Sequence, residues 1–121
     1  MVRFCEIADE FADRADFLVV YIEEAHAQGE FDFSSNRYNF SQHKGLDDRI
    51  AAAEQMIEEM QGKMHFPTVV DNMYNGAMYA YGARPERIYI ILDGVIMYQG
   101  KRGPYYNDMR EFNSRLSQLC S

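Results

Sequence analysis

Hydrophobic residues recur along this chain at spacings that separate predicted helices from predicted strands. Spacings of three and four residues predict helices over 2–15, 48–61 and 107–119, with a shorter helix over 72–81. Apolar runs rich in Val, Ile and aromatic residues predict strands over 17–22 and 66–71 and a hairpin over 87–98. The resulting order, αβ-loop-αβαββα, indicates one α/β layered domain over residues 1–121.

Residues that favour turns and helix ends mark the predicted boundaries. Asp93-Gly94 lies between two β-rich runs and predicts a two-residue hairpin turn. Asp47 and Asn107 are predicted helix caps, and Gly62 and Gly82 are predicted helix stops. The inward face of the second helix is predicted to carry Ile50, Ala53, Ile57 and Met60.

The apolar run over 17–22 ends abruptly in a polar cluster, Glu23, Glu24 and His26. An unbroken run of this kind predicts a strand buried on both faces. Ligands of open α/β sheets gather beyond the carboxyl ends of such strands, so the cluster stands where chemistry is expected. If the strand continued through it, Tyr21 and Glu23 would share one face and Glu24 would lie on the other.

Composition excludes several classes of function. The net charge is −7 and no basic run follows a phosphate backbone, so we expect no nucleic-acid partner. No apolar run reaches the roughly 18–20 residues of a membrane span, and no signal peptide is visible. Cys5 and Cys120 are isolated, and no His/Cys set has zinc spacing, so we expect no metal site and a reducing compartment.

A long polar and aromatic segment over 27–46 lacks helical or strand periodicity. Loops of this length in compact domains are often functional. Its aromatic rings and His43 fit two interpretations equally well. The loop either packs its rings onto the domain or forms a lid with aromatic walls for an apolar ligand.

Several motifs resemble known families. The segments over 66–71, 80–83 and 85–100 resemble the second half of thioredoxin-like and peroxiredoxin-like domains. Tyr21-Ile-Glu-Glu-Ala-His26 resembles the signature of the iodothyronine deiodinases, and Gln42-His43 with Leu46-Asp-Asp-Arg49 resembles their next histidine segment. The residues over 98–104 resemble the loop after their hairpin, so the similarity runs over essentially the whole chain.

The resemblance implies reductive removal of iodine from thyroid hormone or a related iodinated phenol. In that family a selenocysteine attacks iodine and a thiol cosubstrate regenerates it, with no bound cofactor. Tyr21, Glu24 and His26 are then a hydrogen-bonded proton relay, whereas His26 could otherwise cap backbone carbonyls. His43 would bind the phenol end of the hormone and Arg87 its acidic end. Otherwise His43 is a surface histidine and Arg87 pairs with an acid such as Glu86. The proline before the matching strand, here Pro85, is often cis.

The chain departs from the family pattern at its start, because Met1 aligns with the Met that closes the selenocysteine segment. We hypothesise an upstream in-frame UGA read as stop, which transcript sequence before Met1 would test. The expected fold is then a thioredoxin-like sheet with flanking helices whose central first strand, between 17–22 and 87–92, is missing. Such a chain should be inactive alone and prone to association. The full-length form should be a membrane-anchored homodimer whose domain faces the cytoplasm.

Three functions compete. The first is an iodothyronine deiodinase, the second a thioredoxin-like or peroxiredoxin-like thiol oxidoreductase, and the third a non-catalytic remnant of the fold. The segment before Met1 would discriminate between them. A Sec that follows Ser-Cys-Thr there favours the deiodinase, and a CxxC motif favours the thiol oxidoreductase. A transcript with neither Cys nor Sec in that segment favours the remnant. Cys5 is not a credible nucleophile, since it lies one turn into the first helix and its neighbours indicate an inward or lateral face.

Overall fold

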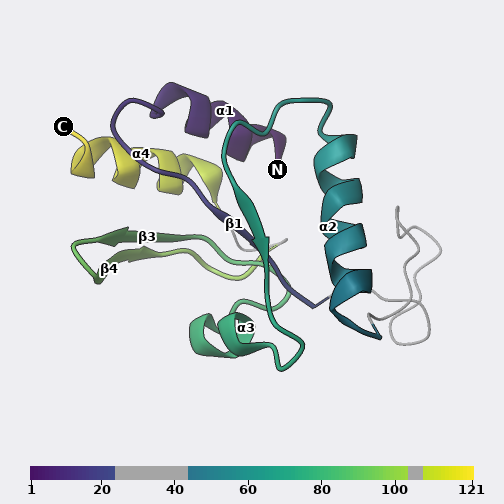
Figure 1. Cartoon of the computed structure of the whole chain (residues 1–121). Helices are drawn as coiled ribbons and strands as arrows, with labels where there is room; N and C mark the ends of the chain where they lie inside the picture. The colour runs from purple at the N-terminus through teal and green to yellow at the C-terminus, as the bar shows by residue number, and fades with distance from the viewer. Residues whose placement is uncertain (24–43, 104–107) are drawn as a thin grey trace.

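The computed structural model describes residues 1–23, 44–103 and 108–121. Its elements follow the predicted order (Figure 1). They are α1 (Val2–Glu10), β1 (Val19–Tyr21), α2 (Leu46–Glu59), β2 (Thr68–Val70), α3 (Gly76–Tyr81), β3 (Tyr89–Leu92), β4 (Val95–Gln99) and α4 (Met109–Leu119). Among these helices none is long and apolar enough to cross a membrane.

The described strands form two small sheets. β1 and β2 run parallel, with Val20 opposite Val69, and β3 and β4 form an antiparallel hairpin. Asp93 and Gly94 both have positive φ angles, 51° and 78°, as the predicted hairpin turn requires. Within the described residues each sheet has two strands, so β1 and β3 are not neighbours in one sheet. The architecture is α/β with small sheets, and the described strands do not form a continuous thioredoxin-like sheet.

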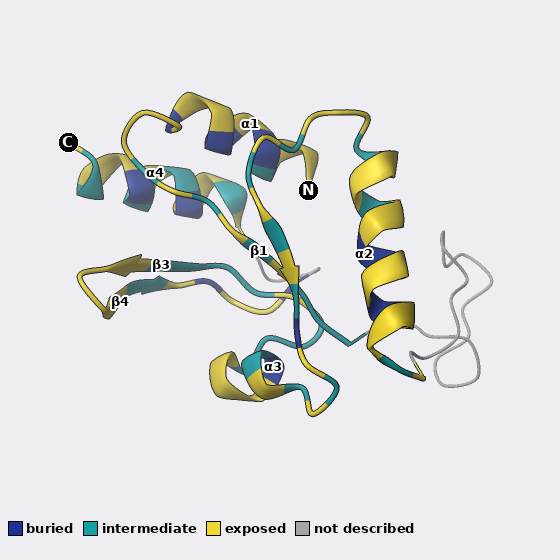
Figure 2. Cartoon of the chain, in the orientation of Figure 1, coloured by how far each residue is buried: buried dark blue, intermediate teal, exposed yellow. Residues whose placement is uncertain are grey.

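The hydrophobic core lies where α1 and α4 pack side by side (Figures 1 and 2). Its fully buried members are Ile7, Phe11, Phe112 and Leu116. The ring of Phe4 stacks on Phe112 at 5.8 Å and meets Phe17 and Phe66 edge-on at 5.7 and 5.5 Å. Because Phe17 and Phe66 each lie two residues before one of the parallel strands, this aromatic cluster connects that sheet to the helices.

The prediction that strand 17–22 is buried on both faces is wrong. Only Val19–Tyr21 is strand, and Leu18 and Val20 are 54% and 38% exposed. Val69, opposite Val20, is also exposed, so one face of the parallel pair is not covered by the described residues. An unbroken apolar run means that either face of the strand can be buried without burying polar side chains. Whether both faces are buried depends on which elements pack against them.

The second helix begins earlier and buries a different face than predicted. Its N-cap is Gly45 and not Asp47, and Asp48 accepts a hydrogen bond from the Lys44 N–H at 3.0 Å. The buried residues are Arg49, Ala52 and Ala53. Ala53 is therefore inward as predicted, whereas Ile50 and Ile57, also predicted to be inward, are 37% and 39% exposed. Small alanines let the helix approach β2 closely, and this contact rotates the apolar stripe partly into solvent.

The carboxyl-terminal helix is capped by Asp108, not by Asn107, which lies outside the described residues. The Asp108 carboxylate accepts hydrogen bonds from the N–H groups of Arg110 and Glu111 at 2.9 and 3.3 Å. These two donors lower the pKa of Asp108. Both residues can cap a helix, so the sequence pattern placed the boundary one residue early.

Candidate active site

The carboxyl ends of the two parallel strands are joined by a backbone hydrogen bond. The N–H of Asp71, just after β2, donates to the carbonyl oxygen of Tyr21 at 2.8 Å. β1 ends at Tyr21, which is half-buried, so Glu23 no longer follows the alternation of the strand. The end of β1 therefore lies beside the loop that leads to α3.

Asp71 organises the start of α3. Its side chain is 4% exposed, and its carboxylate accepts hydrogen bonds from the N–H groups of Asn72, Ala77 and Met78, each at 2.9 Å. Three backbone donors stabilise a buried carboxylate and satisfy N–H groups that the first turn of a helix leaves unpaired. The loop between β2 and α3 is thus held from within by one charged side chain.

Arg49 holds the same loop from α2. It is 2% exposed, and its Nη1 donates to the carbonyl oxygen of Asn72 at 2.8 Å and to Oδ1 of Asn75 at 3.0 Å. A longer contact of 3.4 Å reaches the carbonyl oxygen of Asp71. Sequence analysis gave Arg49 and Asp71 no role. The available signal was the stripe Arg49, Ala52 and Ala53, which places the arginine on the small-residue face of the helix.

An ion pair connects the end of β1 to the loop before β3. The carboxylate of Glu23 lies 3.2 Å from Nη1 of Arg84, and the two side chains are 20% and 39% exposed. The Arg84–Pro85 peptide bond is cis, as the resemblance suggests. This ion pair connects the signature segment, which contains Glu23, to the segment that leads into the hairpin.

An open groove of about 530 Å³ lies between α3 and the hairpin. Arg87 lies in it and donates through Nε to the carbonyl oxygen of Gly100 at 2.8 Å and through Nη1 to that of Gly82 at 3.2 Å. The rings of Tyr81 and Tyr89 meet edge-on at 5.0 Å, and the Tyr89 hydroxyl donates to the Tyr81 carbonyl. The groove therefore combines an aromatic wall with a guanidinium.

The predicted site residues are only partly covered by the described structure. Tyr21 lies at the end of β1, and Arg87 lies in the groove just before β3. Glu24, His26 and His43 lie outside the described residues, as does most of the predicted loop over 27–46. The relay and the two-residue clamp therefore stay predictions. Among the described residues Arg87 forms no ion pair with Glu86, and the alternative that Arg87 pairs with another neighbouring acid stays a prediction.

The structure also places Cys5, His65 and the possible metal-binding side chains of the described residues. Cys5 is 2% exposed, and burial raises the pKa of its thiol, which disfavours the reactive thiolate. His65 is exposed and lies 2.9 Å from the Asp9 carboxylate. Across residues 1–23, 44–103 and 108–121, no group of three or more His, Cys, Asp and Glu side chains is arranged to hold a metal.

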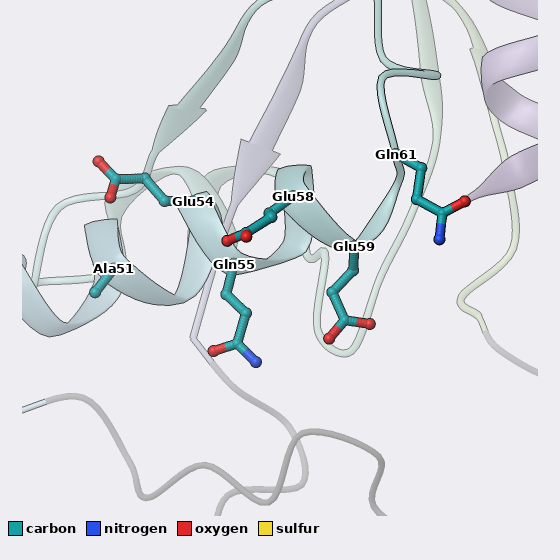
Figure 3. A pocket seen from close by; sticks show the side chains of 6 residues that line it. All are labelled: Ala51, Glu54, Gln55, Glu58, Glu59 and Gln61. Carbon is teal, nitrogen blue, oxygen red and sulfur yellow. The ribbon is translucent and has the colours of Figure 1, made fainter.

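A second hollow, of about 570 Å³, lies along the solvent side of α2. It is lined by Ala51, Glu54, Gln55, Glu58, Glu59 and Gln61. Figure 3 shows these polar side chains projecting outward without converging on one point. We interpret it as a solvated helix face.

Residues 1–120 match the family model described as iodothyronine deiodinase. The thyroxine 5-deiodinase of Sparus aurata is 42% identical over 118 residues, which are 98% of this chain and 43% of the relative. The type I iodothyronine deiodinase of Xenopus laevis is 42% identical over 103 residues, 85% of this chain and 39% of the relative. For the type II enzyme of Petromyzon marinus the identity is 40% over 117 residues, 97% of this chain and 40% of the relative. The chain spans about two fifths of the length of these relatives and belongs to the iodothyronine deiodinase family.

Proposed function

We propose that this chain is part of the catalytic domain of an enzyme that reductively removes iodine from iodothyronines. The family match over residues 1–120 carries the proposal, and the named activities of the relatives supply the substrate class. The chain covers 43% of the thyroxine 5-deiodinase of Sparus aurata, so we propose the activity for a full-length protein like this relative.

The proposed reaction exchanges iodine for hydrogen on an aromatic ring of the iodothyronine. The carbon–iodine bond breaks, iodine passes to a selenolate as a selenenyl iodide, and the ring carbon takes a proton. One thiol then displaces iodide to give a selenenyl sulfide, and a second thiol releases the selenol and a disulfide. The protein outside this sequence would supply the selenocysteine, since the buried Cys5 is unsuited to the role.

The proton for the ring carbon would come through Tyr21, Glu24 and His26. A histidine side chain can both accept and donate a proton near neutral pH, which suits His26 to this role. Two observations support the relay. First, β1 ends at Tyr21, so the side chains after it need not alternate between the two faces of a strand, and Glu24 can lie on the same side as Tyr21. Second, the neighbouring Glu23 forms an ion pair with Arg84.

The substrate would be held at its two ends by His43 and Arg87. The groove around Arg87 supports this proposal, because an aromatic wall and a guanidinium suit an iodinated phenol that carries a carboxylate. Arg87 is already oriented by two backbone carbonyls, so little side-chain freedom would be lost on binding.

The remaining expectations complete the proposed enzyme. The full-length protein would have a thioredoxin-like sheet whose additional strand pairs with β1 and β3, each of which has a free edge within the described residues. It would be a homodimeric selenoprotein, reduced by a thiol and anchored to a membrane outside this sequence, with the catalytic domain facing the cytoplasm.

Iodide release by the full-length protein tests the proposal. With thyroxine and a dithiol, the protein should release iodide, and His26→Asn should lower the rate by about a hundredfold or more, as is typical for loss of a general acid. His65→Asn is the matched control, because His65 is exposed and bonded to Asp9, and it should retain the rate. Disulfide reduction without any iodide release would instead indicate a thiol oxidoreductase, and neither activity would indicate a binding remnant.

A further inference from the structure

A chain of hydrogen bonds connects α2 to Tyr21 at the end of β1. Arg49 of α2 donates through Nη1 to the carbonyl oxygens of Asp71 and Asn72, at 3.4 and 2.8 Å. The N–H of Asp71 in turn donates to the carbonyl oxygen of Tyr21 at 2.8 Å. Because Arg49 and Asp71 are 2% and 4% exposed, water competes little for these bonds. The position of Tyr21 therefore depends on a residue of a different element.

Asn75 receives the same guanidinium at the far end of the loop. It is the N-cap residue of α3, where an Asn side chain usually accepts from the first N–H groups of the helix. Among the described residues its side chain makes no such capping bond, and its Oδ1 accepts instead from Nη1 of Arg49 at 3.0 Å. Asp71 accepts from the N–H groups of Ala77 and Met78 in its place. The Asn75 side chain therefore holds Arg49 and leaves the capping of the helix to Asp71.

Arg49 thus fixes the loop from Asn72 to Asn75 onto α2, which packs against β2 (Figure 1). A buried guanidinium needs acceptors at defined places, because a buried donor without a partner costs free energy. Its donors point in fixed directions within one plane, so they constrain the direction of each acceptor as well as its distance. A lysine at this position would keep the charge without that plane. The geometry therefore suits precise placement of the loop and, through Asp71, of Tyr21.

We propose that Arg49 is a positioning residue that fixes Tyr21 at the end of β1 through the loop after β2. This inference rests on the proposed function, in which Tyr21 belongs to the proton relay. In this role Arg49 touches neither the substrate nor the reacting atoms. Because a displacement of about 1 Å can lower an enzymatic rate by about a hundredfold, loosening the loop should slow proton transfer. Substrate binding should change little, since Arg87 lies just before β3 and not in this loop.

Hydrogen exchange and iodide release by the full-length protein test this role together. Arg49→Lys should speed exchange of the Asp71 N–H about tenfold or more, the factor expected for loss of one hydrogen bond to a charged group. With thyroxine and a dithiol, kcat should fall about tenfold while KM stays within about twofold. Asn75→Gly removes one acceptor but suits the φ of 59° at this position, so it should have the same effects to a smaller extent. This milder variant keeps the test available if Arg49→Lys does not fold.

A double-mutant cycle separates positioning from a general loss of stability. Tyr21→Phe removes the hydroxyl that the proposed relay uses and retains the ring and the backbone. If Arg49 acts through Tyr21, Arg49→Lys should change kcat of the Tyr21→Phe protein by less than about twofold. If Arg49 only stabilises the fold, the two substitutions should act independently and their effects on kcat should multiply.

Arg115→Lys is the matched control, because Arg115 is also a helical arginine that donates to a distant backbone carbonyl, that of Met97 at 3.4 Å. It should leave kcat and the exchange of the Asp71 N–H unchanged. Unchanged exchange in Arg49→Lys, a rise in KM without a fall in kcat, or multiplying effects with Tyr21→Phe would each overturn the role of Arg49. A wild-type protein that releases no iodide refutes the proposed function, and exchange of the Asp71 N–H then decides by itself whether Arg49 fixes Tyr21.

Discussion

Replacement of Asp71 tests how the loop beside the candidate site is held. The carboxylate is 4% exposed and accepts three backbone hydrogen bonds of 2.9 Å. Asp71→Asn keeps one oxygen for the N–H groups of Asn72 and Ala77. Its amide nitrogen must then face the N–H of Met78, because Oδ2 is the atom that accepts from Met78.

The expected loss follows from these bonds. One buried N–H left without an acceptor costs about 1–3 kcal/mol, and hydrogen bonds to a neutral oxygen are roughly half as strong as those to a carboxylate. We therefore expect Asp71→Asn to lower the free energy of unfolding by about 2–4 kcal/mol, and Asp71→Ala by slightly more. For a domain of this size such a loss lowers Tm by roughly 10 °C.

Thermal and urea unfolding of the full-length variant, followed by circular dichroism, measure this loss. Asp13→Asn is the matched control, since its side chain is 77% exposed and pairs with Arg14 next to it in sequence. It should change the free energy of unfolding by less than about 0.5 kcal/mol. If Asp71→Asn were as mild as Asp13→Asn, the carboxylate would not hold the loop and the start of α3.

Three further predictions concern titratable groups. Burial, with a hydrogen bond to a glutamate of α4, raises the pKa of Tyr98 to about 12, so the unfolded chain loses this proton first. Stability should therefore fall as pH rises from about 10 to 12, and unfolding of Tyr98→Phe should lack this component. The hydrogen bond to Asp9 raises the pKa of His65, so its contribution is present at low pH and is lost as pH rises through the folded value; Asp9→Asn should lower that pKa in an NMR titration. Cys5, whose pKa burial raises, should react with iodoacetamide in the native protein more slowly than Cys120, and faster labelling of Cys5 would contradict its position in the core.

Local signals predicted well wherever the backbone itself requires a residue type. Asp93-Gly94 forms the expected hairpin turn because both positions need positive φ, and Gly82 ends α3 for the same reason. The motifs also identified the family, which the match over residues 1–120 confirms. These features depend on a few neighbouring residues, so they can be predicted from the sequence alone.

Faces and polar partners were less predictable, because they depend on segments far apart in the chain. Ile50 and Ile57 have helical spacing, yet α2 turns Arg49 and its alanines inward to meet β2 and the loop after it. A buried arginine is expected to be costly, so its place became apparent only with the carbonyl oxygens and the asparagine side chain that receive it.

The sequence by itself determined the order of the elements, the tight turns and the family, since these follow from periodicity, backbone preference and motif. The tertiary structure alone decided which strand faces are covered, how Asp71 and Arg49 hold the loop after β2, and that Arg87 and Arg102 share one carbonyl oxygen. The physical reason is that a charged side chain lies wherever distant backbone groups can satisfy it, and folding brings those groups together.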